Sequence, residues 1–124
     1  MSGHSQASTD SQNLCDALFN ALSEHISDLQ RNPTKGSCGI WQNGKTRFAY
    51  VYHSKTKQQI EIWCRGNVDD LLANDPGLGI VARDSTKKGW EESFPARFRI
   101  IRNQQISQAA EYLKNISFLA SSLK

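Results

Sequence analysis

The first 30 residues of this chain contain no lysine or arginine. Their charged side chains are four acids, Asp10, Asp16, Glu24 and Asp28. Residues 31–102, by contrast, hold thirteen bases against seven acids. Because charges of one sign gathered on a surface attract a partner of opposite charge, the basic middle segment tells more about binding than the net charge of +3.

Long hydrophobic runs are missing as well. No stretch approaches the ~20 apolar residues of a membrane span, and the N-terminus has neither the basic region nor the apolar run of a secretory signal. The three cysteines, Cys15, Cys38 and Cys64, are odd in number and lack metal-ligand spacing. We therefore predict a soluble, reduced, cytoplasmic protein with no zinc site and no disulfide framework. Cys15 and Cys64 are expected to be small buried apolar residues.

Catalytic motifs are absent too. Glu61 lies in a strand pattern like the carboxylate strand of nucleases, but the lysine of that arrangement is missing. His25 and His53 have no partner evident in the sequence, and no nucleophile elbow or Cys–His signature is present. Of the hypotheses considered, an enzyme is the least favoured, because no group of acids, bases or metal ligands meets the requirements of a reaction. We predict a protein with no catalytic residues, no metal and no cofactor.

The pattern along the chain predicts one domain after a short tail. Residues 1–11 are small and polar, which is typical of a disordered segment, and residues 12–122 form the predicted α+β domain. Apolar residues at helical spacing predict helices over about 12–30 and 104–121. Strands are predicted between the helices, at 37–42, 45–53, 58–65 and 95–102, with a short strand or irregular edge at 78–82. Asn43-Gly44 predicts a hairpin turn, and Asn67 is expected to cap a helical turn at 68–72.

These elements predict a two-layer fold, with an antiparallel sheet of four to five strands and both helices packed on one face. Period-2 alternation assigns the face beneath the helices to Phe48, Tyr50, Ile60, Ile62, Phe98 and Ile100. The opposite face then carries Arg47, Trp63, Arg65, Arg97 and Arg99.

A tryptophan among four arginines offers stacking together with phosphate contacts. The leading hypothesis is therefore a nucleic-acid-binding domain, for DNA or RNA, in which Arg47, Arg65, Arg97 and Arg99 contact phosphates and Trp63 stacks. Nothing predicts base specificity, so backbone recognition is expected. Two alternatives stay open. In the first, the face binds an acidic protein partner, as in an accessory module of a regulatory or defence system. In the second, it is an ordinary solvated surface whose long side chains cover Trp63.

A second candidate is the segment Lys87-Lys88-Gly89-Trp90. A basic loop that ends in an aromatic can grip a nucleic-acid backbone, so Lys87, Lys88 and Trp90 join the predicted binding residues. The alternative is that Trp90 anchors the loop in the core, because tryptophans are highly buried on average.

The order of short motifs resembles a known family. Phe48-Ala49-Tyr50-Val51 is followed by Ile60-Glu61-Ile62-Trp63, Pro76-Gly77-Leu78, Lys87-Lys88-Gly89-Trp90 and a closing helix with Tyr112-Leu113. This order resembles the YjbR-like "double-wing" domains. It is also similar to a related small domain of unknown function, found in predicted transport proteins and nuclease-linked proteins. The double-wing resemblance implies DNA binding without catalytic residues.

Overall fold

The computed structural model describes residues 11–32, 38–53, 59–83 and 94–122. Within these ranges the elements follow the order α2 (Ser11–Ser23), β1 (Leu29–Asn32), β2 (Gly39–Asn43), β3 (Thr46–His53), β4 (Ile60–Cys64), α3 (Val68–Ala73), β5 (Val81–Ala82), β6 (Ala96–Ile100), η2 (Asn103–Gln105) and α4 (Ile106–Ser122). Every strand pair is antiparallel, in the spatial order β1-β2-β3-β4-β6-β5. The predicted α+β class is confirmed, with six strands in the described sheet instead of four to five.

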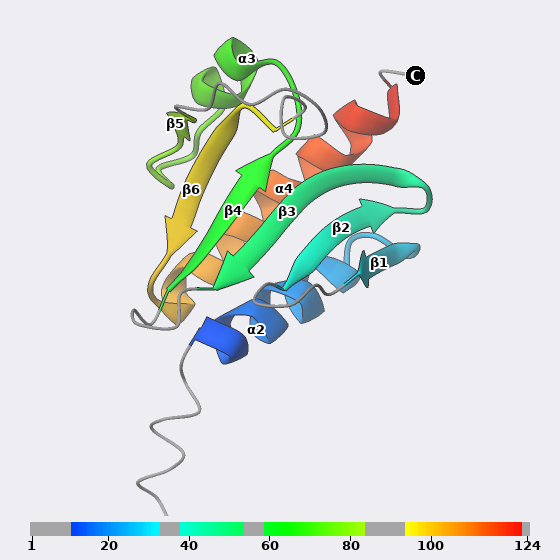
Figure 1. Cartoon of the computed structure of the whole chain (residues 1–124), viewed down its shortest axis with the longest axis vertical. Helices are drawn as coiled ribbons and strands as arrows, with labels where there is room; N and C mark the ends of the chain where they lie inside the picture. The colour runs from blue at the N-terminus through cyan, green and yellow to red at the C-terminus, as the bar shows by residue number, and fades with distance from the viewer. Residues whose placement is uncertain (1–10, 33–37, 54–58, 84–93, 123–124) are drawn as a thin grey trace, which may run out of the picture.

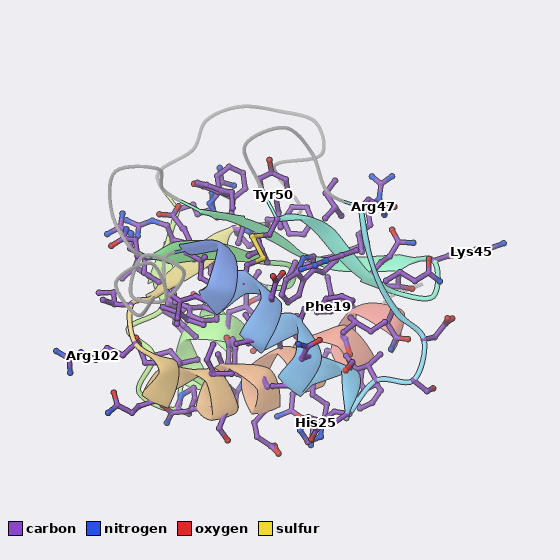
Figure 2. The ribbon with its side chains drawn as sticks, turned by 90° about the horizontal axis from the view of Figure 1, so that it is seen from below. Phe19, His25, Lys45, Arg47, Tyr50 and Arg102 are labelled. Atoms are coloured by element: carbon purple, nitrogen blue, oxygen red, sulfur yellow. A yellow bond between two sulfur atoms is a disulfide. The ribbon has the colours of Figure 1, made fainter. Side chains whose placement is uncertain are left out.

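The helices α2 and α4 lie side by side on one face of the sheet (Figures 1 and 2). Their apolar stripes meet the sheet in one continuous core. The fully buried members include Leu18, Leu22, Ile60, Ile62, Ile100 and Leu113. Burial of this apolar area supplies the main driving force for the fold, and the predicted two-layer packing of both helices on one face is confirmed.

One irregularity in β3 decides which side chains reach the other face. Trp41 of β2 pairs with Ala49, but the next residue, Gln42, pairs with Arg47. Phe48 is therefore an extra residue on β3, a β-bulge. A bulge shifts the alternation by one residue, so every side chain beyond it points to the opposite face from the one that simple alternation predicts.

The prediction that Tyr50 faces the helices is wrong for this reason. Phe48 is buried, as predicted, but so are Ala49 and Val51 just after it. Tyr50 and Tyr52 instead turn to the side without helices, where both are partly exposed. Of the residues predicted beneath the helices, the remainder are buried as expected: Ile60, Ile62, Phe98 and Ile100.

The first helix is shorter than predicted. It ends at Ser23, and residues 29–32 form β1 beside β2. The helix prediction extended to residue 30 because Ile26 and Leu29 continue the helical spacing. In the structure the amides of His25 and Ile26 both donate to the Leu22 carbonyl, which closes the last turn. The pairing of β1 with the next strand, β2, is a contact beyond the helical repeat, so the apolar spacing does not record it.

Two local predictions concern a hairpin turn and a helix cap. The predicted hairpin between β2 and β3 is present, but it turns through Gly44 and Lys45 rather than Asn43 and Gly44, because Asn43 pairs with Thr46. Gly44 has a φ of 62° that favours glycine. Asn67 caps α3, since its side-chain oxygen accepts from the Asp69 and Asp70 amides.

Two of the three cysteines form a disulfide. Cys15 of α2 is bonded to Cys38, just before β2, with their Cα atoms 6.4 Å apart. Figure 2 shows the bond between the blue helix and the sheet. The expectation of a chain without disulfides is therefore wrong, because spacing along the sequence does not reveal that these residues lie together across the layers. Cys64 is free and buried, as predicted.

Candidate functional site

The side of the sheet away from the helices carries aromatic and basic side chains in two neighbouring rows. One row aligns Tyr50 with Trp63 and Trp63 with Arg97, across β3, β4 and β6. In Figure 2, Tyr50 and Arg47 project from the sheet on the side opposite to α2. We call this surface the helix-free face and define it by Arg47, Tyr50, Tyr52, Glu61, Trp63, Arg65, Arg97 and Arg99.

Three aromatic rings form the centre of the helix-free face. The ring centroids of Tyr50 and Tyr52 lie 5.5 Å apart, and each lies 5.3 Å from the Trp63 ring. The Tyr52 and Trp63 rings meet edge to face, at 87°. These separations and angles are favourable for aromatic pairs. All three side chains are partly exposed, so the rings form part of the surface.

Glu61 lies in the second row, between Tyr52 and Arg99. One carboxylate oxygen accepts hydrogen bonds from the Tyr52 hydroxyl at 2.7 Å and from the Trp63 indole N–H at 2.9 Å. The other oxygen accepts from Nε of Arg99 at 3.0 Å. The Glu61 side chain is only 15% exposed. This single carboxylate therefore holds two of the rings and one arginine in fixed orientations.

The electrostatics of Glu61 and Tyr52 follow from these contacts. Burial alone raises the pKa of the Glu61 carboxyl, but hydrogen bonds from Tyr52, Trp63 and Arg99, with the charge of Arg97, bring it below its usual value. Burial, and then the Glu61 carboxylate, raise the pKa of Tyr52 to about 12. At neutral pH Glu61 is ionised and Tyr52 is a proton donor.

Arg83 covers the Trp63 ring and was not predicted. Its guanidinium carbon lies 3.5 Å from the ring centroid, which is a close cation–π contact. Nη1 also donates to the Phe94 carbonyl at 2.8 Å. Arg83 follows the two-residue strand β5, where no periodic pattern marks a side chain as part of a face. Sequence reasoning therefore had no signal for it.

The arginines give the helix-free face its charge. Arg47 and Arg99 are exposed, and Arg65 and Arg97 are partly exposed. Arg65 donates to the Arg47 carbonyl at 3.0 Å, so these two lie together at one end of the face. With Arg83, which covers Trp63, the face carries five arginines and one described carboxylate, Glu61. The surface is therefore strongly basic.

The structure brings together five of the predicted binding residues, Arg47, Trp63, Arg65, Arg97 and Arg99. The other three, Lys87, Lys88 and Trp90, lie outside the described residues. Tyr50, Tyr52, Glu61 and Arg83 belong to the same surface and were missed. The bulge at Phe48 hid the tyrosines, and Glu61 was considered only as a metal ligand.

Two features are absent from the described residues, a cluster of metal ligands and a membrane-spanning helix. In the ranges 11–32, 38–53, 59–83 and 94–122, no group of three or more His, Cys, Asp or Glu side chains is placed to hold a metal ion. No helix within those ranges is long and apolar enough to cross a membrane. The oxygens of Glu61 are engaged by the protein itself. What the helix-free face offers is positive charge and aromatic surface.

A separate hollow of about 620 Å³ lies where α3 meets the C-terminal half of α4. Its walls are largely apolar, from Leu71, Ile116, Phe118 and Leu119. Arg65 is the one residue that it shares with the helix-free face. The two features are thus distinct, and the five described binding residues lie on the helix-free face.

Comparison of the chain with protein-family models, with curated proteins and with solved structures found no match. The resemblance to the double-wing domains therefore stays a prediction.

Proposed function

We propose that this protein is a non-enzymatic nucleic-acid-binding domain and that the helix-free face is its binding surface. The observation that carries the proposal is the cluster of three partly exposed rings, Tyr50, Tyr52 and Trp63, bordered by arginines. Arginine binds phosphate oxygens through a planar fork of N–H donors, and aromatic rings provide stacking surfaces for bases.

The arrangement of the arginines favours backbone recognition. Arg47 and Arg65 lie together at one end of the face, while Arg97 borders the rings through its pairing with Trp63. Contacts of this kind fix a nucleic acid in place but carry no sequence information. We therefore expect binding with little dependence on base sequence.

The proposed partner implies a cytoplasmic location, where nucleic acids are found. The Cys15–Cys38 disulfide opposes that location, because disulfides are rare in the cytosol. We also propose that the chain belongs to the double-wing family. This proposal rests on the order of motifs in the sequence and predicts the same activity.

The test is the binding of labelled DNA and RNA oligonucleotides at several salt concentrations, followed by fluorescence anisotropy. Arg47→Glu reverses the charge of an exposed residue on the helix-free face. Arg102→Glu makes the same change at an exposed residue that Figure 2 places well away from Tyr50 and Arg47. The two variants have the same net charge, so a difference in their affinity for nucleic acid reports the position of the reversed charge.

We expect the wild-type protein to bind at low salt and to weaken steeply as salt rises. Arg47→Glu should weaken binding about tenfold or more, because it removes one phosphate contact and adds a repulsion. Arg102→Glu should have a much smaller effect. Absence of binding at low salt, or equal losses in both variants, would contradict the proposal.

A further inference from the structure

The helix-free face has exposed aromatic rings that restrict the form of nucleic acid it accepts. Its centre combines three aromatic rings with the Glu61 carboxylate, which accepts from Tyr52 and Trp63. The arginines Arg47 and Arg65 lie beyond the rings, at the end of the face. Positive charge thus borders the rings at this end, and it also covers Trp63, since the Arg83 guanidinium carbon lies 3.5 Å from the centroid of that ring.

The Glu61 carboxylate is paired with Arg99 at 3.0 Å and its side chain is only 15% exposed, so the arginines around the rings decide where phosphates lie. Tyr50 and Tyr52 are partly exposed rings beside Trp63. What suits the rings is an uncharged, flat group, and nucleic-acid bases are such groups because each has a π-face.

A double helix does not offer its bases in this way. The bases of a duplex are stacked inside, and its outside is lined with phosphates, so a broad sheet surface meets phosphates first. In a single strand, unstacked bases can turn to one side while the backbone follows the other. We propose that the helix-free face binds unpaired single strands, with bases over Tyr50 and Tyr52 and phosphates along the arginine border. This inference rests on the proposed function, and it adds the class of nucleic acid.

Tyr50 is the ring best suited to a test. Tyr52 and Trp63 both donate to Glu61, so changing either one disturbs the carboxylate. Tyr50 contacts the other two rings at 5.5 and 5.3 Å and is partly exposed. Tyr50→Leu removes the π-surface but leaves the charge of the face unchanged. Circular dichroism and thermal unfolding will show whether the variant keeps its fold.

The experiment compares three oligonucleotides of equal length, in DNA form: a single strand, the duplex of the same sequence, and an abasic single strand with the same phosphates. An RNA single strand is a fourth arm. We expect the two base-bearing single strands to bind about 10-fold or more tighter than the duplex and the abasic strand. We expect Tyr50→Leu to lower the affinity for the base-bearing strands about 5- to 100-fold and to change the affinity for the abasic strand little.

The abasic arm uses the wild-type protein, so it decides the question even if Tyr50→Leu fails to fold. Equal, salt-dependent binding of the abasic strand and the normal strand would overturn the single-strand inference and leave the proposed function standing. Tighter binding of the duplex would do the same. Failure of all four to bind at low salt would overturn both.

Discussion

The Tyr52 hydroxyl donates a 2.7 Å hydrogen bond to the Glu61 carboxylate across neighbouring strands of the helix-free face. The bond joins a side chain turned outward by the β3 bulge to the carboxylate that also holds Trp63 and Arg99. Hydrogen bonds to a charged acceptor contribute more to stability than bonds between neutral groups. The pair is thus a structural support of the proposed site.

Tyr52→Phe tests this support. The variant keeps the ring and loses the hydroxyl, so the free energy of unfolding should fall by about 1–2 kcal/mol. Urea denaturation measures the change. Glu61→Gln and the double variant complete a mutant cycle, in which we expect a coupling of at least about 0.5 kcal/mol. Strictly additive effects of the two changes would show that the bond contributes nothing.

The lowered pKa of Glu61 predicts a pH dependence of stability. A carboxyl whose pKa is lower in the folded state contributes stability at pH values above its usual pKa of 4.5, and this contribution is lost as pH falls through the folded pKa. The free energy of unfolding of the wild-type protein should therefore fall relative to that of Glu61→Gln once the pH drops below about 4.5. Denaturation series at several pH values measure the difference. If the difference in the free energy of unfolding between the two proteins stays constant as the pH falls below 4.5, the pKa of Glu61 is not lowered in the folded state.

The disulfide determines which cysteines can react with a thiol reagent. The denatured, unreduced chain should react with a thiol reagent at Cys64 alone, and at all three cysteines after reduction. Three reactive thiols without reduction would show that Cys15 and Cys38 are not bonded in solution.

Loss of this bond should also lower stability. Cys15 and Cys38 are 23 residues apart, and closing a loop of this size stabilises a fold by about 3 kcal/mol in the chain-entropy account. Cys38→Ala should therefore lower the free energy of unfolding by an amount of that order, as measured in urea. The matched control is the wild-type protein under reducing conditions, which should approach the variant. A reductant that leaves wild-type stability unchanged would contradict this prediction.

Much of the architecture was predictable from local pattern, and the site only in part. The alternation of β4 and β6 is uninterrupted, so Trp63, Arg97 and Arg99 were assigned to the helix-free face from the sequence. Tyr50 and Tyr52 were not, because one extra residue at Phe48 reverses the alternation and no turn residue marks the bulge. Contacts between separate elements were equally hidden, and they include the pairing of β1 with β2, the contact of Arg83 with the Trp63 ring and the disulfide.

The central claim, that arginines on the helix-free face hold a phosphate backbone, is tested most directly by a salt slope. For single strands, log K falls with log salt concentration by about 0.7 per phosphate contact, so four arginines predict a slope of roughly −3. The measurement is the slope for a labelled single strand, with the wild-type protein and with Arg47→Ala/Arg97→Ala. We predict that the double variant has a slope shallower by about 1.4. Equal slopes for the two proteins, or a wild-type protein that does not bind at low salt, would contradict the claim.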